Sequence, residues 1–164
     1  MALTLFLLRH AKTQPAASGE QDFDRPLYKE GVNQGIRLGQ HLALLKIKPN
    51  HVICSPARRA KDTLLNVVEP LAISENEVQF EPSVYTGETD QLLELIHGTD
   101  NHYHSVLLTG HNPSLTSLVG YLVRGFGESM EPCDFLHIEF DTNEWSSIGK
   151  HSGLLKNSIP SSSL

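Results

Sequence analysis

Three short apolar runs constrain the fold of this chain more than any other feature of its sequence. Runs of this length and composition are typical of strands that are buried on both faces of a sheet. They cover residues 3–8, 51–54 and 105–109. Apolar residues recur at helical spacing in the segments 31–45, 57–68 and 115–123. This alternation predicts a three-layer α/β/α domain with a mostly parallel central sheet.

Weaker patterns predict the elements between these segments. Residues 12–28 are rich in Gln, Ala, Ser, Gly, Asp and Pro, and they predict a loop. A short strand is expected at 78–80. A further helix is expected over 90–96, where Asp90 would cap its first turn and Gly98 would end it.

The last third of the chain predicts an antiparallel strand and a tail. Residues 135–140 alternate between apolar and polar, which is typical of a half-exposed strand at a sheet edge. We expect a single domain over residues 1–157 and a disordered tail over 158–164. Earlier in the chain, Gly35 and Gly39 lie one helical turn apart, which predicts close packing of their helix on the sheet.

The composition excludes several classes of function. The formal charge is −6 at pH 7 and no basic run stands out, which argues against non-specific binding to nucleic acid or to acidic membranes. Cys54 and Cys133 fit no metal-ligand spacing, and Cys54 is expected to be a reduced core thiol. No basic leader precedes the first apolar run and no segment reaches transmembrane length. The sequence therefore predicts a soluble cytoplasmic protein.

Polar residues that suit phosphoryl chemistry follow each of the three apolar runs. These residues are Arg9-His10, Ser55-Pro56 with Arg58-Arg59, and Gly110-His111 with Asn112-Pro113. Ser55-Pro56 and Asn112-Pro113 each predict an N-cap with proline at the first helical position. Because the carboxyl ends of parallel strands meet at one edge of a sheet, we expect these residues to lie together there. Two helix N-termini would point to the same edge.

Such an edge would form a pocket for a dianion. Arginine neutralises phosphate oxygens with its planar fork, and neutral histidine can serve as a nucleophile or a proton carrier. The pocket would contain two histidines, two or three arginines and no obvious neutralising carboxylate. The alternative is that unrelated polar strand ends carry these residues by chance.

Four segments of the chain resemble the histidine phosphatase superfamily, whose fold is phosphoglycerate-mutase-like. Residues 8–11 are similar to its Arg-His-Gly signature, with Ala11 in place of Gly. Residues 55–63 are similar to its Ser-Pro-x-x-Arg-Ala-x-x-Thr segment, and residues 109–113 resemble its second-histidine motif. Asp24-Arg25-Pro26-Leu27, followed by Gly31, resembles the SixA-type branch of the superfamily.

The resemblance implies a role for each matched residue. His10 would be the nucleophile and would form a phosphohistidine intermediate. Three residues would hold the phosphoryl oxygens in the transition state, namely Arg9, Arg59 and His111. The register of the motif selects Arg59 over Arg58, which is expected on the solvated face of its helix. Arg25 either reaches the substrate or forms an ion pair within its own acidic loop.

The sequence does not clearly supply an acid for the leaving group. Many members of the superfamily carry a glutamate after the third strand, where this chain has Ser83 between Glu81 and Glu88. Glu81 or Glu88 would serve as the acid only if this loop folds inward, and both are expected to be solvated. A substrate without need of an acid, such as phosphohistidine, is therefore favoured over an alkyl ester. The resemblance implies a protein phosphohistidine phosphatase of the SixA type. The alternatives are a phosphomonoesterase acting on a small molecule or phosphoserine, and an inactive phosphate-binding module.

The expected partner is a phosphorylated protein, such as a His-phosphotransfer domain, or a small phosphorylated molecule. No cofactor is expected. His102 and His104 lie in a polar loop without a third ligand, so no metal site is expected there.

Overall fold

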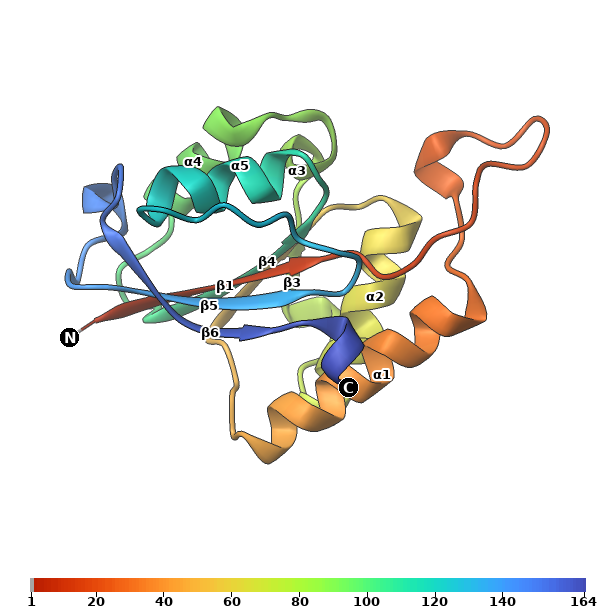
Figure 1. Cartoon of the computed structure of the whole chain (residues 1–164), viewed down its shortest axis with the longest axis horizontal. Coiled ribbons are helices and arrows are strands. Elements are labelled where there is room, and N and C mark those ends of the chain that lie inside the picture. The colour runs from red at the N-terminus through yellow and green to blue at the C-terminus, as the bar shows by residue number, and fades with distance from the viewer. Residues whose placement is uncertain (1) are drawn as a thin grey trace.

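A mixed sheet forms the middle layer of the computed structural model, which describes residues 2–164 (Figure 1). Its strands are β1 (Leu3–Arg9), β2 (His51–Cys54), β3 (Val78–Phe80), β4 (Ser105–Gly110), β5 (Phe135–Phe140) and β6 (Gly153–Ile159). The six strands lie in the order β3-β2-β4-β1-β5-β6. The neighbours from β3 to β1 are parallel, whereas β5 is antiparallel to both β1 and β6.

Helices cover both faces of this sheet. They are α1 (Lys29–Leu44), α2 (Arg58–Val68), α3 (Pro82–Thr86), α4 (Thr89–His97) and α5 (Ser114–Leu122). Helices α1 and α2 lie on one face, and α3, α4 and α5 lie on the other (Figure 1). The predicted three-layer α/β/α architecture with a mostly parallel sheet is thereby confirmed. Within residues 2–164, no helix combines the length and the apolar character that crossing a membrane requires.

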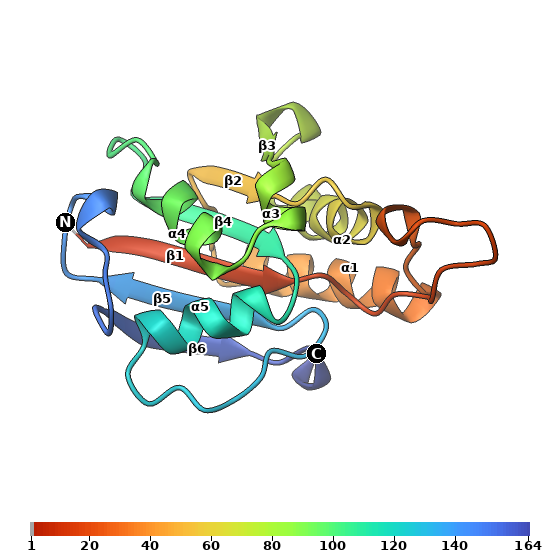
Figure 2. The same cartoon turned by 90° about the horizontal axis from the view of Figure 1, so that it is seen from above.

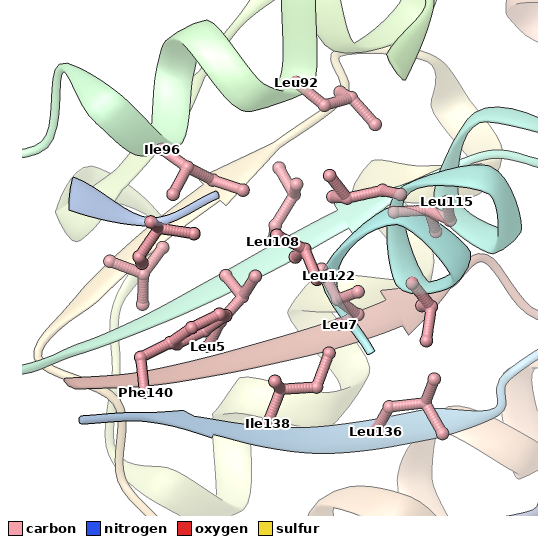
Figure 3. Packing of buried hydrophobic residues seen from close by; sticks show 14 of the residues in the cluster. Leu5, Leu7, Leu92, Ile96, Leu108, Leu115, Leu122, Leu136, Ile138 and Phe140 are labelled. Atoms are coloured by element: carbon pink, nitrogen blue, oxygen red, sulfur yellow. The ribbon is translucent and has the colours of Figure 1, made fainter. Parts of the chain in front are cut away.

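The central strand β1 is apolar over residues 5–8, because both of its faces are buried there. Leu5 and Leu7 pack toward α4 and α5, in a cluster that also contains Leu108 and Leu115 (Figure 3). Leu8 belongs to the second cluster, on the side of α1 and α2. Full burial of one such side chain contributes roughly 1.5–3 kcal/mol. The strand therefore anchors its own carboxyl end firmly between the two helical layers.

The two glycines of α1 pack against another helix instead of the sheet, which corrects the sequence-based expectation. A Cβ on Gly39 would collide with the backbone oxygen of Val67 in α2. A Cβ on Gly35 would lie 3.1 Å from the Cβ of Asn66, also in α2. The missing side chains let α1 approach α2, and this contact holds α2 in place under the sheet edge.

The helices after β2 and β4 begin later than the sequence predicts. Helix α2 starts at Arg58 with Ala57 as its N-cap, so Ser55-Pro56 is not the cap. Helix α5 starts at Ser114, one residue after the predicted proline position, and α4 is capped by Glu88 instead of Asp90. Helices α2 and α5 are therefore each preceded by a short turn, and both turns lie at the sheet edge.

The carboxyl-terminal segment also differs from the prediction. The strand over 135–140 exists, but it is not the edge strand, because β6 pairs along its other side. Residues 158 and 159 belong to β6, and residues 161–163 form a 3₁₀ turn, so this segment is not the expected disordered tail. Ile159 is buried, and the backbone N–H of Ser161 donates to Oδ1 of Asp134 at 3.0 Å.

The carboxyl ends of β1, β2 and β4 lie side by side at one edge of the sheet (Figure 2). The parallel register pairs Arg9 with Gly110 and Cys54 with Thr109. Helices α2 and α5 begin at this edge, and the segment 12–28 leaves β1 here as a loop that contains a 3₁₀ turn at Asp22–Asp24. The residues that follow these strands therefore meet in one place.

Candidate active site

Two histidines face each other at this sheet edge. His10 follows β1 directly, His111 follows β4, and their ring centroids are 5.3 Å apart. The backbone extends the sheet pairing beyond the strands, because the N–H of His10 donates to the oxygen of Gly110 at 3.1 Å. Arg9 ends β1, and Arg59 lies in the first turn of α2. The four residues that the motifs select come from three adjacent strand ends.

The hydrogen bonding of His10 defines which ring nitrogen is free. Its Nδ1 lies 2.9 Å from the backbone oxygen of Ala11. A carbonyl oxygen can only accept, so Nδ1 carries the proton and Nε2 keeps its lone pair. The pKa of His10 is lowered to about 4, mainly by burial and also by the charges of Arg59 and Arg9, against the opposing effect of the Ala11 carbonyl. At pH 7 the ring of His10 is therefore neutral and Nε2 keeps a free lone pair.

Thr63 holds the backbone that follows β1 against α2. Its buried hydroxyl accepts a hydrogen bond from the backbone N–H of Ala11 at 2.8 Å and donates one to the backbone oxygen of Arg59 at 2.7 Å. One side chain thus joins the end of β1 to the first turn of α2. Thr63 belongs to the quoted Ser-Pro motif, but its position in that motif alone did not indicate this contact.

Ser55 sets the orientation and the tautomer of His111. The Ser55 hydroxyl lies 2.7 Å from Nε2 of His111, and it also accepts from the backbone N–H of Ala57 at 3.2 Å. The only acceptor for its own hydrogen in the described chain is Nε2 of His111, so His111 carries its proton on Nδ1. Burial lowers the pKa of His111 to about 3, followed by the effects of His10 and Arg59, so this ring is neutral too.

Two buried donors of the pocket have no partner among residues 2–164. One is Nδ1 of His111 and the other is Nε of Arg9. The guanidinium of Arg9 is anchored at its other end, because Nη1 donates to the backbone oxygen of Met130 at 2.8 Å. Buried donors without partners are uncommon in folded proteins. A bound anion is one partner that would satisfy both of them.

A carboxylate that the sequence did not indicate lies at the pocket. The Nη2 of Arg59 donates to Oδ2 of Asp22 at 3.1 Å, and its Nη1 donates to the backbone oxygen of Asp22 at 2.8 Å. The expectation of a pocket without a neutralising carboxylate is therefore wrong. The Tyr85 hydroxyl donates to Oδ2 of Asp22 at 2.8 Å. Together with the neighbouring Arg25 and Arg59, this hydrogen bond lowers the pKa of Asp22 to about 2. The signal in the sequence was weak, because Asp22 is one of several polar residues in a loop.

The other two arginines that the motifs drew attention to, Arg25 and Arg58, occupy different surroundings. Arg25 does form the ion pair within its own loop, since Nη1 donates to Oδ1 of Asp22 at 3.1 Å and Nε donates to the backbone oxygen of Gln14 at 2.8 Å. Its charge also helps to lower the pKa of His10, which places Arg25 beside the pocket. Arg58 is exposed and pairs with Asp62 at 3.6 Å on the outer face of α2, as expected.

Neither Glu81 nor Glu88 makes a hydrogen bond to the other site residues in the described part of the chain. Glu81 accepts from Gln79 at 3.3 Å, and Glu88 is an exposed N-cap of α4. The segment between them instead contributes Tyr85, whose ring centroid lies 5.7 Å from that of His111. Its hydroxyl is engaged with Asp22, which is ionised at neutral pH.

The other titratable clusters do not form a metal site. In the part of the chain that the structure describes, no three His, Cys, Asp or Glu side chains come together as a ligand set. His102 pairs with Asp100 and packs on Tyr103. Cys54 and Cys133 are both buried free thiols, and burial raises the pKa of each.

Comparison with known proteins gives consistent similarities. The model of the histidine phosphatase superfamily (branch 1) matches residues 5–83. The structure of the protein histidine phosphatase SixA complexed with tungstate covers 98% of this chain and 99% of its own, with a TM-score of 0.83 and 22% identity. A SixA structure from Nakamurella multipartitia has a TM-score of 0.81 and 25% identity, with 97% of this chain and 96% of that chain covered.

Two curated proteins are similar in sequence. A chloroplastic protein of Arabidopsis thaliana is 27% identical over 158 residues, which are 91% of this chain and 72% of that protein. The mitochondrial serine/threonine-protein phosphatase PGAM5 of Xenopus laevis is 44% identical over 59 residues. That match covers 36% of this chain and 21% of the longer protein.

Proposed function

The chain belongs to the histidine phosphatase superfamily, and from this premise we propose that it hydrolyses phosphorylated substrates through a phosphohistidine formed on His10. The observation that carries this proposal is the hydrogen bond of His10 Nδ1 to the oxygen of Ala11, which leaves Nε2 unprotonated. Around that nitrogen lie the donors that a transferring phosphoryl group requires, from Arg9, Arg59 and His111.

The reaction has two steps. In the first, Nε2 of His10 forms a bond to phosphorus while the bond from phosphorus to the leaving group breaks. The leaving group departs with a proton that it already carries or takes from water. In the second step, water attacks the same phosphorus, the P–N bond breaks, and orthophosphate leaves with His10 neutral again. The buried donors of Arg9 and His111 stabilise the charge on the phosphoryl oxygens in both steps.

A protein phosphohistidine is the proposed substrate. Asp22 is ionised at neutral pH, and Glu81 and Glu88 make no hydrogen bond to the other site residues within the described chain. A site without a placed acid suits a leaving imidazole that is protonated before the P–N bond breaks. The proposed partner is therefore a phosphorylated protein, such as a His-phosphotransfer domain, and the proposed location is the cytoplasm.

A phosphomonoesterase is the second candidate. The segment shared with the serine/threonine-protein phosphatase of Xenopus laevis is 44% identical, so a phosphoserine or a small phosphate ester is a substrate to compare. An inactive phosphate-binding module is less favoured, because the lone pair of His10 Nε2 has no purpose in a site that only binds phosphate.

The deciding experiment measures kcat/KM for a phosphohistidine protein, an aryl phosphate and an alkyl phosphate under the same conditions. We expect turnover to follow leaving-group quality, with the alkyl phosphate slowest. His10→Ala is the control, and it should abolish both turnover and covalent labelling with phosphate. Retained turnover in that variant would contradict the nucleophile assignment, and faster turnover of the alkyl ester would favour the second candidate.

A further inference from the structure

The carboxylate of Asp22 accepts hydrogen bonds from three side chains, those of Arg25, Arg59 and Tyr85. Its Oδ1 accepts from Nη1 of Arg25 at 3.1 Å. Its Oδ2 accepts from Nη2 of Arg59 at 3.1 Å and from the hydroxyl of Tyr85 at 2.8 Å. Tyr85 also packs edge-on against Phe23, with ring centroids 5.1 Å apart. The 3₁₀ turn at Asp22–Asp24 is thereby fixed to both α2 and α3.

The contacts of Arg59 leave one particular edge of its guanidinium available. A guanidinium is planar and has five N–H donors in fixed directions. Asp22 occupies the edge formed by Nη1 and Nη2, through its backbone oxygen and its carboxylate. The Cζ of Arg59 also lies 5.9 Å from the ring centroid of Tyr85. The edge that contains Nε–H makes no hydrogen bond within the described residues, so it is the edge that can receive phosphoryl oxygens.

We propose that Asp22 is the positioning residue of Arg59: it holds one edge of the guanidinium so that the other edge is presented to the phosphoryl group. This inference rests on the proposed function. The side chain of Arg59 has several rotatable bonds, and each would have to be ordered during the reaction if Asp22 did not order them beforehand. Tyr85 and Arg25 act on Asp22 in turn, since they fix the two oxygens of its carboxylate.

The opposite role would make Asp22 a competitor that occupies the place of the substrate. A competing carboxylate would have to take the donors that phosphate needs. Asp22 instead takes one N–H from each of two nitrogens and leaves three of the five N–H groups of Arg59 free. The geometry therefore favours positioning over competition, and the two roles predict opposite effects of removing the charge.

The test measures kcat/KM of Asp22→Asn with an aryl phosphate. Asp22 has a side-chain exposure of 53%, so the variant should fold, which its melting temperature checks. Because a misplaced catalytic group can cost up to about 100-fold in rate, we expect a loss of about 10- to 100-fold, mainly in kcat. Asp22→Glu should restore part of it. Asp24→Asn is the matched control, because Asp24 lies in the same turn and makes no side-chain hydrogen bond in the described chain.

A second background separates positioning from general damage. Arg59→Lys keeps a charge but has no fork for Asp22 to orient. In that background we expect Asp22→Asn to cost at most about threefold, because residues that act as a unit are not additive. An equal loss in both backgrounds, or no loss or a gain in the wild-type background, would overturn the inference. If the wild-type protein itself neither turns over the ester nor takes up covalent phosphate, the proposed function fails instead.

Discussion

At the scale of single residues, the direction of each hydrogen bond assigns the chemistry of the pocket. The carbonyl of Ala11 can only accept, so it determines which nitrogen of His10 is free. The hydroxyl of Ser55 donates to His111, so the second ring presents a donor where the first presents a lone pair. Two residues of the same type therefore differ in role because their backbone and hydroxyl neighbours differ.

The adjacent arginines of α2 offer a prediction with a built-in control. Arg59→Ala should lower kcat/KM for an aryl phosphate by about 10²–10³-fold, the usual cost of losing a donor to transition-state charge. Arg58→Ala should stay within about twofold, because Arg58 is exposed and pairs only with Asp62. Steady-state kinetics on both variants checks this, and equal losses would show that the wrong arginine has been assigned.

Motifs identified the residues next to strand ends and Arg25 in the 12–28 loop, but they did not identify Asp22 or Tyr85. Arg9, His10 and His111 are fixed by the strands that precede them, so their meeting followed from parallel pairing. Asp22 and Tyr85 reach the pocket only through the fold of the 12–28 loop and the start of α3. Neither segment has a periodicity that places a side chain, so the sequence alone did not reveal them.

At the scale of elements, strand ends and helix starts build the site, and the helix contacts keep them there. Helices α1, α2, α4 and α5 were predicted because each has an apolar face, whereas the short helix α3 was not. The start of α2 was misplaced, because Ser55 bonds to His111 instead of acting as an N-cap. The edge strand β6 was missed because Lys156, Asn157 and Ser158 are exposed and hide its alternation.

Two glycine substitutions are expected to change the free energy of unfolding in opposite directions, because Gly39 lies in the contact between α1 and α2 and Gly120 does not. Gly39→Ala should lower the free energy of unfolding by about 1–3 kcal/mol, because the added methyl group meets the backbone of Val67. Gly120→Ala, in the middle of α5, meets no atom within 4 Å and should raise it by about 0.4–1 kcal/mol. Urea unfolding of both variants measures this difference, and similar changes in both would contradict the close packing of α1 on α2.

At the scale of the whole molecule, the pocket lies where the sheet edge, α2 and the 12–28 loop converge, and its charge comes from all of them. Burial and the surrounding arginines keep both histidines neutral, while Asp22 stays ionised beside them. The overall charge of −6 gave no indication of this local arrangement.

The titration of His10 tests this electrostatic arrangement. Since its pKa is lowered to about 4, its ring signal in an NMR titration should stay constant from pH 8 to about 5.5 and change near pH 4. The signal is assigned by its loss in His10→Ala. An unfolded histidine titrates near 6.5, so the unfolded state binds more protons between these values. Stability should therefore fall as the pH drops from about 6.5 toward 4. A midpoint near 6.5 would contradict the buried, arginine-surrounded site.

The hydroxyl of Thr63 has a consequence for how the enzyme would fail. Because it bonds to the backbone of Ala11 on one side and to the backbone of Arg59 on the other, the segments that carry His10 and Arg59 are coupled to each other. We therefore expect a change that displaces the start of α2 to displace His10 and Arg59 together. Turnover would then be lost in a single step, and not in two separate stages.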